Sequence, residues 1–360
     1  MKRDTLISAT NVSVHYPISG GKLLGPKPVV RAVENVTLNI TKGSFFGLVG
    51  ESGSGKTTLG RAMLKAAPIT SGVVNFNDGE VNYSLSNMSS KELKDYRTRA
   101  QLIFQDPYAA LSPRMTVRDI IAEPLEIMQL TSSREETDKR VREIAAKCRL
   151  NLEHLRRFPH AFSGGQRQRI SIARALVSEP KFVVADESVA ALDVSIQADV
   201  LNLLKEIQQE MGLTFLFISH DLSVVAHICD HVAVMYFGRL VETAPTRELF
   251  NNPCHPYTKA LLSAIPSLDP DAKNLAQKLE GEISNYDRVI SLEEGFRGRG
   301  GLDSMLFEFI SRENIPVKML NIGVEPGYSF ELGTREELHE KVGIGLNSVV
   351  SQVKTFMKNL

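Results

Sequence analysis

The stretch FFGLVGESGSGKTTLGRAM, Phe45–Met63, is the most informative part of this sequence for its architecture. The apolar run at its start predicts a buried strand, a glycine-rich loop follows, and an amphipathic helix comes last. Gly50 and the run Gly55-Lys56-Thr57 satisfy the pattern G-x-x-x-x-G-K-[ST], directly after the strand and directly before the helix. Glycines let such a loop curl so that successive backbone N–H groups point at phosphate oxygens, and the helix N-terminus adds a favourable dipole. The stretch therefore predicts a phosphate-binding loop.

The loop residues have distinct expected roles in holding a nucleotide. We expect Lys56 to reach the β- and γ-phosphates and the Thr57 hydroxyl to hold Mg²⁺. The alternative is a merely flexible glycine loop. It would not explain why the strand, the lysine and the helix occur at the spacing that the motif requires. The residues expected to bind the nucleotide here are Gly50, Glu51, Ser52, Gly53, Ser54, Gly55, Lys56, Thr57 and Thr58.

Apolar runs of strand length alternate with longer amphipathic runs around this loop, which is typical of an α/β domain with a mainly parallel sheet. The stretch Thr116–Leu155 differs, because it has helical spacing and many charges, and it predicts a helical subdomain over about residues 116–165 inserted between two strands. The expected strands are Phe45–Val49, Gln101–Phe104, Lys181–Ala185, Thr214–Ile218 and Val232–Met235, and the expected helices are Lys56–Ala66, Gly165–Ser178, Ile196–Met211 and Leu222–Cys229.

The segment KFVVADE, Lys181–Glu187, predicts a buried strand that ends in two adjacent carboxylates. Ligands of open α/β sheets bind at this end of the strands. We expect Asp186 to support the magnesium ion, directly or through water, and Glu187 to orient or deprotonate the attacking water in phosphoryl transfer. A carboxylate pair after a strand can also be a helix cap, but its place after a phosphate-binding loop favours the catalytic interpretation.

The segment AFSGGQRQRISIARAL, Ala161–Leu176, predicts a second helix with free N–H groups at its start, opened by Ser163, Gly164 and Gly165. One chain has one phosphate-binding loop, so we expect this helix start to cover the γ-phosphate of a nucleotide held by another subunit. An ordinary Ser-Gly helix start with a basic face is the alternative.

Composition excludes several classes of protein. The 360 residues suggest about two domains, and 42% hydrophobic residues are ample for cores. Lys and Arg (42) balance Asp and Glu (42), which argues against a nucleic-acid-coating protein. The cysteines Cys148, Cys229 and Cys254 are widely spaced, which favours a reducing compartment and suggests neither disulfides nor zinc. The start has no long apolar stretch and no run approaches about 20 apolar residues, so we expect membrane contact only through a partner.

Taken in order, these motifs resemble the ATP-binding subunits of ABC transporters, whose cassette is a P-loop NTPase with a mixed sheet and a helical subdomain. The resemblance implies that ATP is the nucleotide, that Gln105 in IFQDP faces the metal and the membrane-subunit interface, and that His220 in FLFISHD lies near the γ-phosphate. It also implies that Tyr16 stacks on adenine, although an aromatic residue in an N-terminal strand can be plain core. The remaining residues that carry the resemblance are Ser163, Gly164, Gly165 and Gln166 of the signature and Ala191, Leu192 and Asp193 of the D-loop.

A branch of this family is indicated by GESGSGKTTLGR, FQDPYAALSPRMTV and, above all, NNPCHPYTKALLSAIP, Asn251–Pro266. These segments resemble the oligopeptide/dipeptide importers, over about residues 5–283. The last segment has no catalytic chemistry of its own, and its proline-bounded helix could be only a docking element. The resemblance implies a peripheral subunit on the cytoplasmic face of the membrane that couples hydrolysis of MgATP to peptide uptake. Implied partners are a second cassette, identical or paralogous, two transmembrane permease subunits and, indirectly, an extracytoplasmic solute-binding protein, with no nucleic acid.

The chain departs from the family pattern at Phe162, Ser188 and Ala190, where Leu, Pro and Ser are common. None of these removes a reacting group, so we expect ATP binding to survive, and the first two to slow closure of a cassette dimer. After LEGEIS, Leu279–Ser284, no cysteine follows, and the iron–sulfur cluster of some members of this branch is excluded on ligand count.

The C-terminal part predicts a linker over 265–285 after a cassette over 1–264, then a small α/β unit over 286–360. RVISLEEGFRGRGGLDSMLFEFI and GVEPGYSFELGTREELHEKVGI resemble the end of the C-terminal domain of transketolase-like enzymes, particularly deoxyxylulose-phosphate synthases. Glu293, Glu294 and nearby glycines could form a metal or phosphate site, but a turn between strand and helix is the simpler interpretation. The expected elements are strands at 289–292 and 317–320 and helices near 302–312, 334–341 and 347–360.

Three other functions stay open. A soluble ABC ATPase acting on nucleic acid or ribosomes usually has paired cassettes, coiled coils or basic arms, which this sequence lacks. A fused metabolic enzyme would need cofactor domains that are absent. A cassette whose transketolase-like tail is regulatory or blocks assembly is harder to dismiss, because an incomplete sheet leaves an exposed edge.

Overall fold

The computed structural model describes residues 4–17, 29–190, 192–263, 283, 286–296, 306–307, 310–311, 315–324, 339–340 and 343–358. The chain divides into two compact units, Met1–Ile265 and Pro266–Leu360, and each is considered by itself. The expected linker lies almost entirely outside the described residues, as does Ala191.

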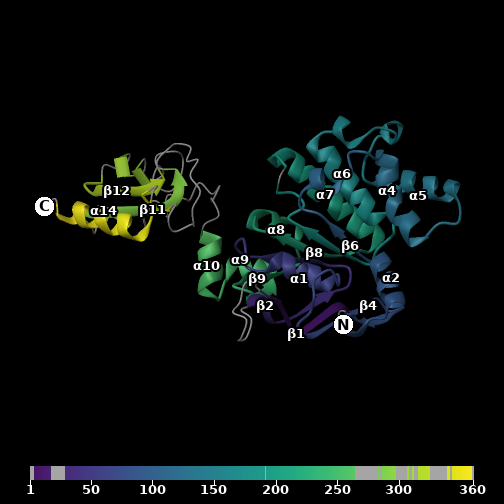
Figure 1. Ribbon diagram of the computed structural model, residues 1–360, viewed down its shortest axis with the longest axis horizontal. Helices are drawn as coiled ribbons and strands as arrows, with labels where there is room; N and C mark the ends of the chain where they lie inside the picture. The colour runs from purple at the N-terminus through teal and green to yellow at the C-terminus, as the bar shows by residue number, and fades with distance from the viewer. Residues whose placement is uncertain are drawn as a thin grey trace, which may run out of the picture. The chain divides into compact units, whose positions relative to one another are not determined.

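A six-stranded sheet forms the centre of the first unit (Figure 1). Its strands run in the order β10-β9-β3-β8-β7-β6, and all neighbours are parallel except β9 and β10. The parallel strands correspond to the five that the sequence predicted, and no predicted boundary of a strand or helix in this unit differs by more than three residues. The strands are β3 Phe45–Val49, β6 Ala100–Ile103, β7 Phe182–Asp186, β8 Thr214–Ser219, β9 His231–Tyr236 and β10 Arg239–Pro245.

A second, antiparallel sheet of four strands covers one face of the central sheet, in the order β2-β1-β4-β5. Exposed and buried residues alternate along much of β2, as expected for a sheet with one face on the core. This sheet makes the architecture mixed rather than purely parallel, and the sequence did not delineate its strands. They are β1 Thr5–Pro17, β2 Val29–Thr41, β4 Ser71–Asn77 and β5 Asn82–Ser84.

Helices complete the unit, and α4, α5 and α6 gather away from β1 and β2 in Figure 1. Side chains cap many of them: Thr116 caps α4, Ser133 caps α5 and Ser163 caps α6. The α-helices are α1 Lys56–Met63, α2 Ser90–Arg99, α3 Pro107–Ala110, α4 Val117–Met128, α5 Arg134–Lys147, α6 Gly164–Leu176, α7 Val194–Met211, α8 Leu222–Ile228, α9 Thr246–Asn251 and α10 Pro256–Ser263; the 3₁₀ turns are η1 Leu85–Asn87, η2 Leu152–His154 and η3 Pro159–Ala161.

The central sheet separates two hydrophobic cores, because successive side chains of a strand point to opposite faces. On β7, Phe182 and Val184 belong to the core shared with α1 and the antiparallel sheet, whereas Val183 and Ala185 belong to the core shared with α4 to α8. Strands β3, β8 and β9 divide their residues in the same way. Burial on both faces explains why these strands are nearly continuous apolar runs in the sequence.

The second unit contains a pair of parallel strands, β11 Arg288–Phe296 and β12 Lys318–Val324, and the helix α14 Leu346–Lys358. Ile283, Ile310 and Ile315 form a small buried cluster with apolar residues packed against it. The strands predicted at 289–292 and 317–320 and the helix predicted near 347–360 coincide with these elements to within a few residues. Most residues of the helices expected near 302–312 and 334–341 lie outside the described part of the chain.

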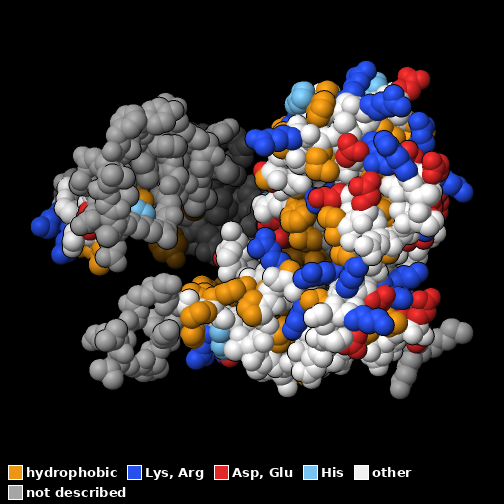
Figure 2. All heavy atoms as spheres, turned by 45° about the vertical axis from the view of Figure 1, so that its right-hand side comes forward, with side chains coloured by type: hydrophobic (Ala, Val, Ile, Leu, Met, Phe, Trp, Pro, Cys, Tyr) orange, Lys and Arg blue, Asp and Glu red, His pale blue; other side chains and the backbone are white. Residues whose placement is uncertain are grey.

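The surface carries both charge signs. Figure 2 shows Lys and Arg side chains interspersed with Asp and Glu on one face of the molecule, with hydrophobic side chains exposed among them. This mixture agrees with the balanced composition of the sequence. In the part of the chain that the structure describes, we find no helix with the length and apolarity needed to cross a bilayer.

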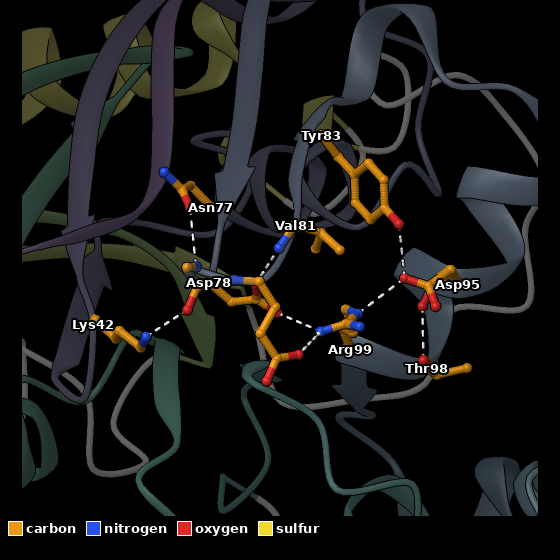
Figure 3. A network of polar contacts seen from close by, with 10 residues as sticks. Lys42, Asn77, Asp78, Val81, Tyr83, Asp95, Thr98 and Arg99 are labelled. Atoms are coloured by element: carbon orange, nitrogen blue, oxygen red, sulfur yellow. Dashed lines mark hydrogen bonds and ion pairs between the residues drawn. The ribbon is translucent and has the colours of Figure 1, made fainter.

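Arg99, at the end of α2, ties that helix to the β4–β5 hairpin (Figure 3). Its guanidinium contacts Asp78 at 2.6 Å, Glu80 at 2.9 Å and Asp95 at 2.9 Å. The Asp78 carboxylate is buried and also accepts hydrogen bonds from the backbone amides of Glu80 and Val81, each at 2.9 Å. Although burial works to raise the pKa of Asp78, these amides and Arg99 outweigh it and lower that pKa. The network fixes the edge of the antiparallel sheet.

We expect Asp78→Asn to lower the free energy of unfolding by about 2–3 kcal/mol at pH 7, because it removes the buried negative charge that accepts hydrogen bonds from Arg99 and from two backbone amides. The folded pKa of Asp78 lies below its unfolded value. The contribution is therefore present above the unfolded pKa and is lost as the pH falls through the folded pKa, so the difference between wild type and variant shrinks in acid. Urea unfolding from pH 7 downward measures it, with the exposed Glu80→Gln as control. Equal unfolding free energies for the two variants would contradict the assignment.

Candidate functional site

The phosphate-binding loop leaves the end of β3 and enters α1, as the sequence predicted, and the surrounding backbone fixes its shape. Gly50, Gly53 and Gly55 have φ of 149°, 79° and 102°, a region that side chains disfavour. A Cβ at Gly50 would lie 2.1 Å from the carbonyl oxygen of Met235, and one at Gly55 would lie 2.1 Å from that of Ala32. Two of the three glycines are therefore required by close approach of β9 and β2 as well as by the turn.

Lys56 is buried against its own loop. Its Nζ donates hydrogen bonds to the carbonyl oxygens of Gly50 at 2.8 Å and Glu51 at 2.7 Å. Burial lowers the pKa of Lys56, while the carboxylates of Glu187 and Asp186 work to raise it. An ammonium that is withdrawn from water and close to the loop amides fits a polyanionic ligand such as a phosphate chain.

Thr57 and Asp186 bring the loop and β7 together. The Thr57 hydroxyl donates to Asp186 Oδ1 at 2.9 Å, and Asp186 is 5% exposed. Burial raises the pKa of Asp186, and the hydrogen bond from Thr57 works to lower it. Hydroxyl and carboxylate oxygens suit Mg²⁺. Among the described residues no group of three or more His, Cys, Asp or Glu side chains could hold a metal, so a Mg²⁺ ion here would need other oxygen ligands as well, such as hydroxyl, amide, phosphate or water oxygens.

Glu187 lies between Gln105 and His220. Gln105 Nε2 donates to Glu187 Oε2 at 2.8 Å, and His220 Nδ1 lies 3.3 Å from Glu187 Oε1. The three residues follow β6, β7 and β8, which are neighbours in the sheet, so their carboxyl ends meet at one edge. Glu187 has a φ of 46°, which is unusual for a residue with a side chain and is typical of functional sites.

A hollow of about 420 Å³ lies beside these groups, within the size range of small-molecule sites. Loop residues between Ser52 and Thr58, except Ser54, line it together with Gln105 and Glu187, whereas Asp186 and His220 do not. Sequence reasoning missed its other walls, which come from β2 and from the turn between β9 and β10. Phe237 is the most prominent of these, because its side chain is 79% exposed. Its aromatic character in a turn was the only available signal.

Tyr16 is not among the residues that line this hollow. It lies at the end of β1, is 37% exposed and pairs in register with Val30, which does line the hollow. Stacking of Tyr16 on adenine therefore stays a prediction.

The signature residues lie outside the hollow and make local caps. Ser163 Oγ accepts from the amide of Gln166 at 3.4 Å, and Gln166 Oε1 accepts from the amide of Ser163 at 3.0 Å, so both residues cap α6. Asp193 caps α7 in the same way, through the amide of Ile196 at 3.0 Å. Gly164 starts α6, and a Cβ at Gly165 would lie 2.4 Å from Ile196 Cγ2, so a glycine lets α6 and α7 approach closely. None of these residues lines the hollow beside the phosphate-binding loop.

Substitution of the loop glycines separates backbone strain from steric conflict. We expect Gly55→Ala to lower the free energy of unfolding by about 2–5 kcal/mol, because it adds a clash with the Ala32 carbonyl to an unfavourable φ. Gly53→Ala is the matched control, since nothing lies within 4 Å of its Cβ, and it should cost only about 1 kcal/mol. Urea unfolding of both variants checks this order, and equal losses would show that the contact with β2 does not constrain the loop.

Two families of known sequences match parts of the chain. The family described as ABC transporter matches residues 33–190. The family described as oligopeptide/dipeptide transporter, C-terminal region, matches residues 241–293, which include α10 and reach into β11. Neither family match extends beyond residue 293, so the transketolase-like resemblance of the segment 286–360 stays a prediction.

Curated relatives are similar over most of their length. The oligopeptide transport ATP-binding protein OppF of Bacillus subtilis is 55% identical over 246 residues, 68% of this chain and 80% of the relative. The dipeptide transport ATP-binding protein DppF of Lactococcus lactis subsp. cremoris is 53% identical over 248 residues, 68% of this chain and 78% of the relative. A putative peptide import ATP-binding protein of Brucella ovis is 48% identical over 283 residues, 79% of this chain and 86% of the relative.

Solved structures of similar fold are ATP-binding cassettes. The dimeric structure of the bacterial ABC transporter cassette MJ0796 has a TM-score of 0.59 and 29% sequence identity, covering 67% of this chain and 99% of the cassette. The same cassette in a post-hydrolysis state, bound to ADP and phosphate, has a TM-score of 0.58 and 28% identity over the same shares.

Proposed function

Because this chain belongs to the ATP-binding subunits of ABC transporters, of the oligopeptide and dipeptide type, we propose that it hydrolyses MgATP to power peptide uptake through membrane permeases. The observation that carries the proposal is the place of Glu187. Its carboxylate lines the same hollow as Lys56 and Thr57, and Asp186 precedes it at the end of β7. One edge of the sheet thus presents groups for phosphate, for metal and for water.

The loop and Lys56 hold the phosphates in this proposal. Backbone amides from Ser52 to Thr58 supply donors, and the Lys56 ammonium keeps its two carbonyl contacts while it turns a remaining donor to the phosphate chain. Thr57 and Asp186 would hold Mg²⁺, with Gln105 as a further oxygen ligand. When bound, the ion would supply neutralisation of the charge that develops on the phosphate oxygens.

Glu187 acts as the general base or water-orienting group. An attacking water needs a carboxylate within hydrogen-bond reach, on the side of the γ-phosphate. Gln105 and His220 each contact one carboxylate oxygen of Glu187, so they orient its side chain. When Glu187 accepts a hydrogen bond from the attacking water, its contact with Gln105 or with His220 must break, or the oxygen must accept both bonds. His220 is then placed to face the γ-phosphate.

A second cassette completes the site. The start of α6, with Ser163 and Gly165, carries the dipole and amides suited to a phosphate but does not line this chain's own hollow. We therefore propose that Ser163, Gly164, Gly165, Gln166 and Asp193 face the nucleotide of a partner cassette, identical or paralogous. The dimeric cassette structures of similar fold support this arrangement.

Permease subunits dock beside Gln105 in this proposal. Phe104, Tyr108 and Phe158 are 43%, 61% and 41% exposed, and the Arg167 guanidinium lies 4.1 Å above the Tyr108 ring centroid. Exposed aromatic side chains of this kind mark protein interfaces. Phe104 and Tyr108 lie close to Gln105 in the sequence. Closure would be transmitted through the Gln105 region and the helical subdomain to two transmembrane subunits. The chain would lie on the cytoplasmic face, with a solute-binding protein on the other side.

We also propose that residues 286–360 form a small α/β unit that resembles the end of the C-terminal domain of transketolase-like enzymes. The parallel pairing of β11 and β12, followed by α14, supports an α/β unit. Mg²⁺ chemistry and ATP turnover do not depend on it in this proposal.

We expect Glu187→Gln to lower ATP turnover by about 10²- to 10⁴-fold, since it removes the general base, while ATP affinity changes by less than about twofold. Phosphate release and calorimetric titration with ATP measure the two quantities. Glu80→Gln, an exposed residue of the β4–β5 hairpin, serves as the matched control. Unchanged turnover in Glu187→Gln would overturn the catalytic assignment.

Removal of residues 266–360 should leave turnover that depends on Glu187, because both large cores lie within the first unit. Steady-state phosphate release by the full chain, by residues 1–265 and by their Glu187→Gln forms tests this. Turnover that appears only after truncation would mean that the second unit inhibits the cassette.

A further inference from the structure

The start of α10 contacts the phosphate-binding loop, although the two segments are 206 residues apart in the chain. The hydroxyl oxygen of Tyr257 accepts a hydrogen bond from the backbone amide of Glu51 at 3.0 Å. Tyr257 belongs to the segment NNPCHPYTKALLSAIP, whose sequence pattern alone indicates no more than a branch of the family or a docking element. The contact gives this segment a direct route to the nucleotide site.

We propose that Tyr257 is a positioning residue of the phosphate-binding loop, holding the Gly50–Glu51 peptide so that Lys56 and the loop amides are ordered before ATP arrives. The inference rests on the proposed nucleotide site. It assigns to the C-terminal segment of the cassette a part in setting ATP affinity.

The Gly50–Glu51 peptide is held from both sides. Its N–H donates to Tyr257, and its carbonyl oxygen, which belongs to Gly50, accepts from Lys56 Nζ at 2.8 Å. The N–H and C=O of a trans peptide point in opposite directions, so one rigid plane links the tyrosine hydroxyl to the lysine ammonium. Hydrogen bonds in such a chain polarise one another. Removal of the hydroxyl frees the plane to rotate and loosens one of the two carbonyl contacts of Lys56.

The hydroxyl is held in place by the way α10 begins. Glu242 of β10 accepts hydrogen bonds from the amides of Cys254 at 2.8 Å and His255 at 2.9 Å. Burial works to raise the pKa of Glu242, but hydrogen bonds that include these amides lower it, so the carboxylate stays ionised. The His255 Nδ1 then accepts from the amide of Tyr257 at 3.1 Å. A single carboxylate thus fixes the residues that precede Tyr257.

Packing completes the arrangement. The Tyr257 ring centroid lies 4.2 Å from that of Tyr236, whose ring in turn lies 4.6 Å from that of Phe237, a wall of the hollow. The amide of Gly238 donates to the Ser54 carbonyl at 2.9 Å, so the β9–β10 turn holds the same loop at another point. Burial raises the pKa of Tyr257, which keeps its hydroxyl neutral at physiological pH.

Full-length Tyr257→Phe tests the proposal, with wild type, Tyr236→Phe and Lys56→Ala measured beside it. Loss of one hydrogen bond should raise the dissociation constant for ATP, measured by calorimetric titration, and the KM for ATP by about three- to tenfold. The kcat should change by less than about twofold, because the Tyr257 hydroxyl contacts the backbone of the loop and has no hydrogen bond with Glu187 among those the structure gives. Tyr236→Phe keeps the ring contacts and has no hydroxyl contact with the loop among those the structure gives, so it should bind ATP as wild type does.

Glu242→Gln provides a second, independent variant. It weakens the anchor of α10 without altering the hydroxyl, so it should also raise the dissociation constant for ATP. The double variant with Tyr257→Phe should bind ATP no more weakly than the weaker single variant, because both changes act through one hydrogen bond. Additive losses, or a fall in kcat with KM unchanged, would overturn the proposal.

The controls separate this inference from the proposed function. Failure of the wild type to bind ATP would contradict the proposed function itself. Binding that Lys56→Ala abolishes and Tyr257→Phe leaves unchanged would uphold the nucleotide site and overturn the role of Tyr257.

Discussion

The hydrogen bond from Thr57 to Asp186 joins two parts of the sequence that are 129 residues apart, and the candidate site depends on it. It can form because β3 and β7 both lie beside β8, so that their carboxyl ends meet at one edge of the sheet. The same sheet order places Gln105 and His220 on either side of Glu187. A parallel sheet buried on both faces fixes this order, because each strand contributes side chains to two different cores.

The phosphate-binding loop is enclosed by backbone from several directions. Carbonyl groups of Met235 and Ala32 leave no room for a Cβ at Gly50 and Gly55, the β9–β10 turn binds Ser54, and α10 binds Glu51. A loop held at so many points loses little conformational entropy when a ligand binds, which favours affinity. Elements that come after the last strand of the parallel sheet therefore help to fix the shape of the phosphate-binding loop.

The family membership indicates what kind of protein this chain is, and the geometry of the site indicates how its residues could act. Similarity to curated peptide-transport ATP-binding proteins covers the cassette, and the match of the C-terminal transporter region covers α10. The geometry brings together, at one edge of the central sheet, the groups that phosphoryl transfer requires: a buried ammonium, oxygen ligands and a carboxylate. The second unit has a parallel strand pair and α14 of its own.

The sequence by itself determined the phosphate-binding loop, the carboxylates at the end of β7 and the succession of strands and helices, because each of these is a local pattern of residues. Gln105, Glu187 and His220 follow three neighbouring strands. No local pattern showed that their side chains would lie together, and only the resemblance to a family led us to expect it. Tertiary structure alone decided the antiparallel sheet, the walls of the hollow at Phe237 and the bond between Tyr257 and Glu51. These are contacts between segments far apart in the chain, and no local periodicity encodes which distant backbone group a side chain will meet.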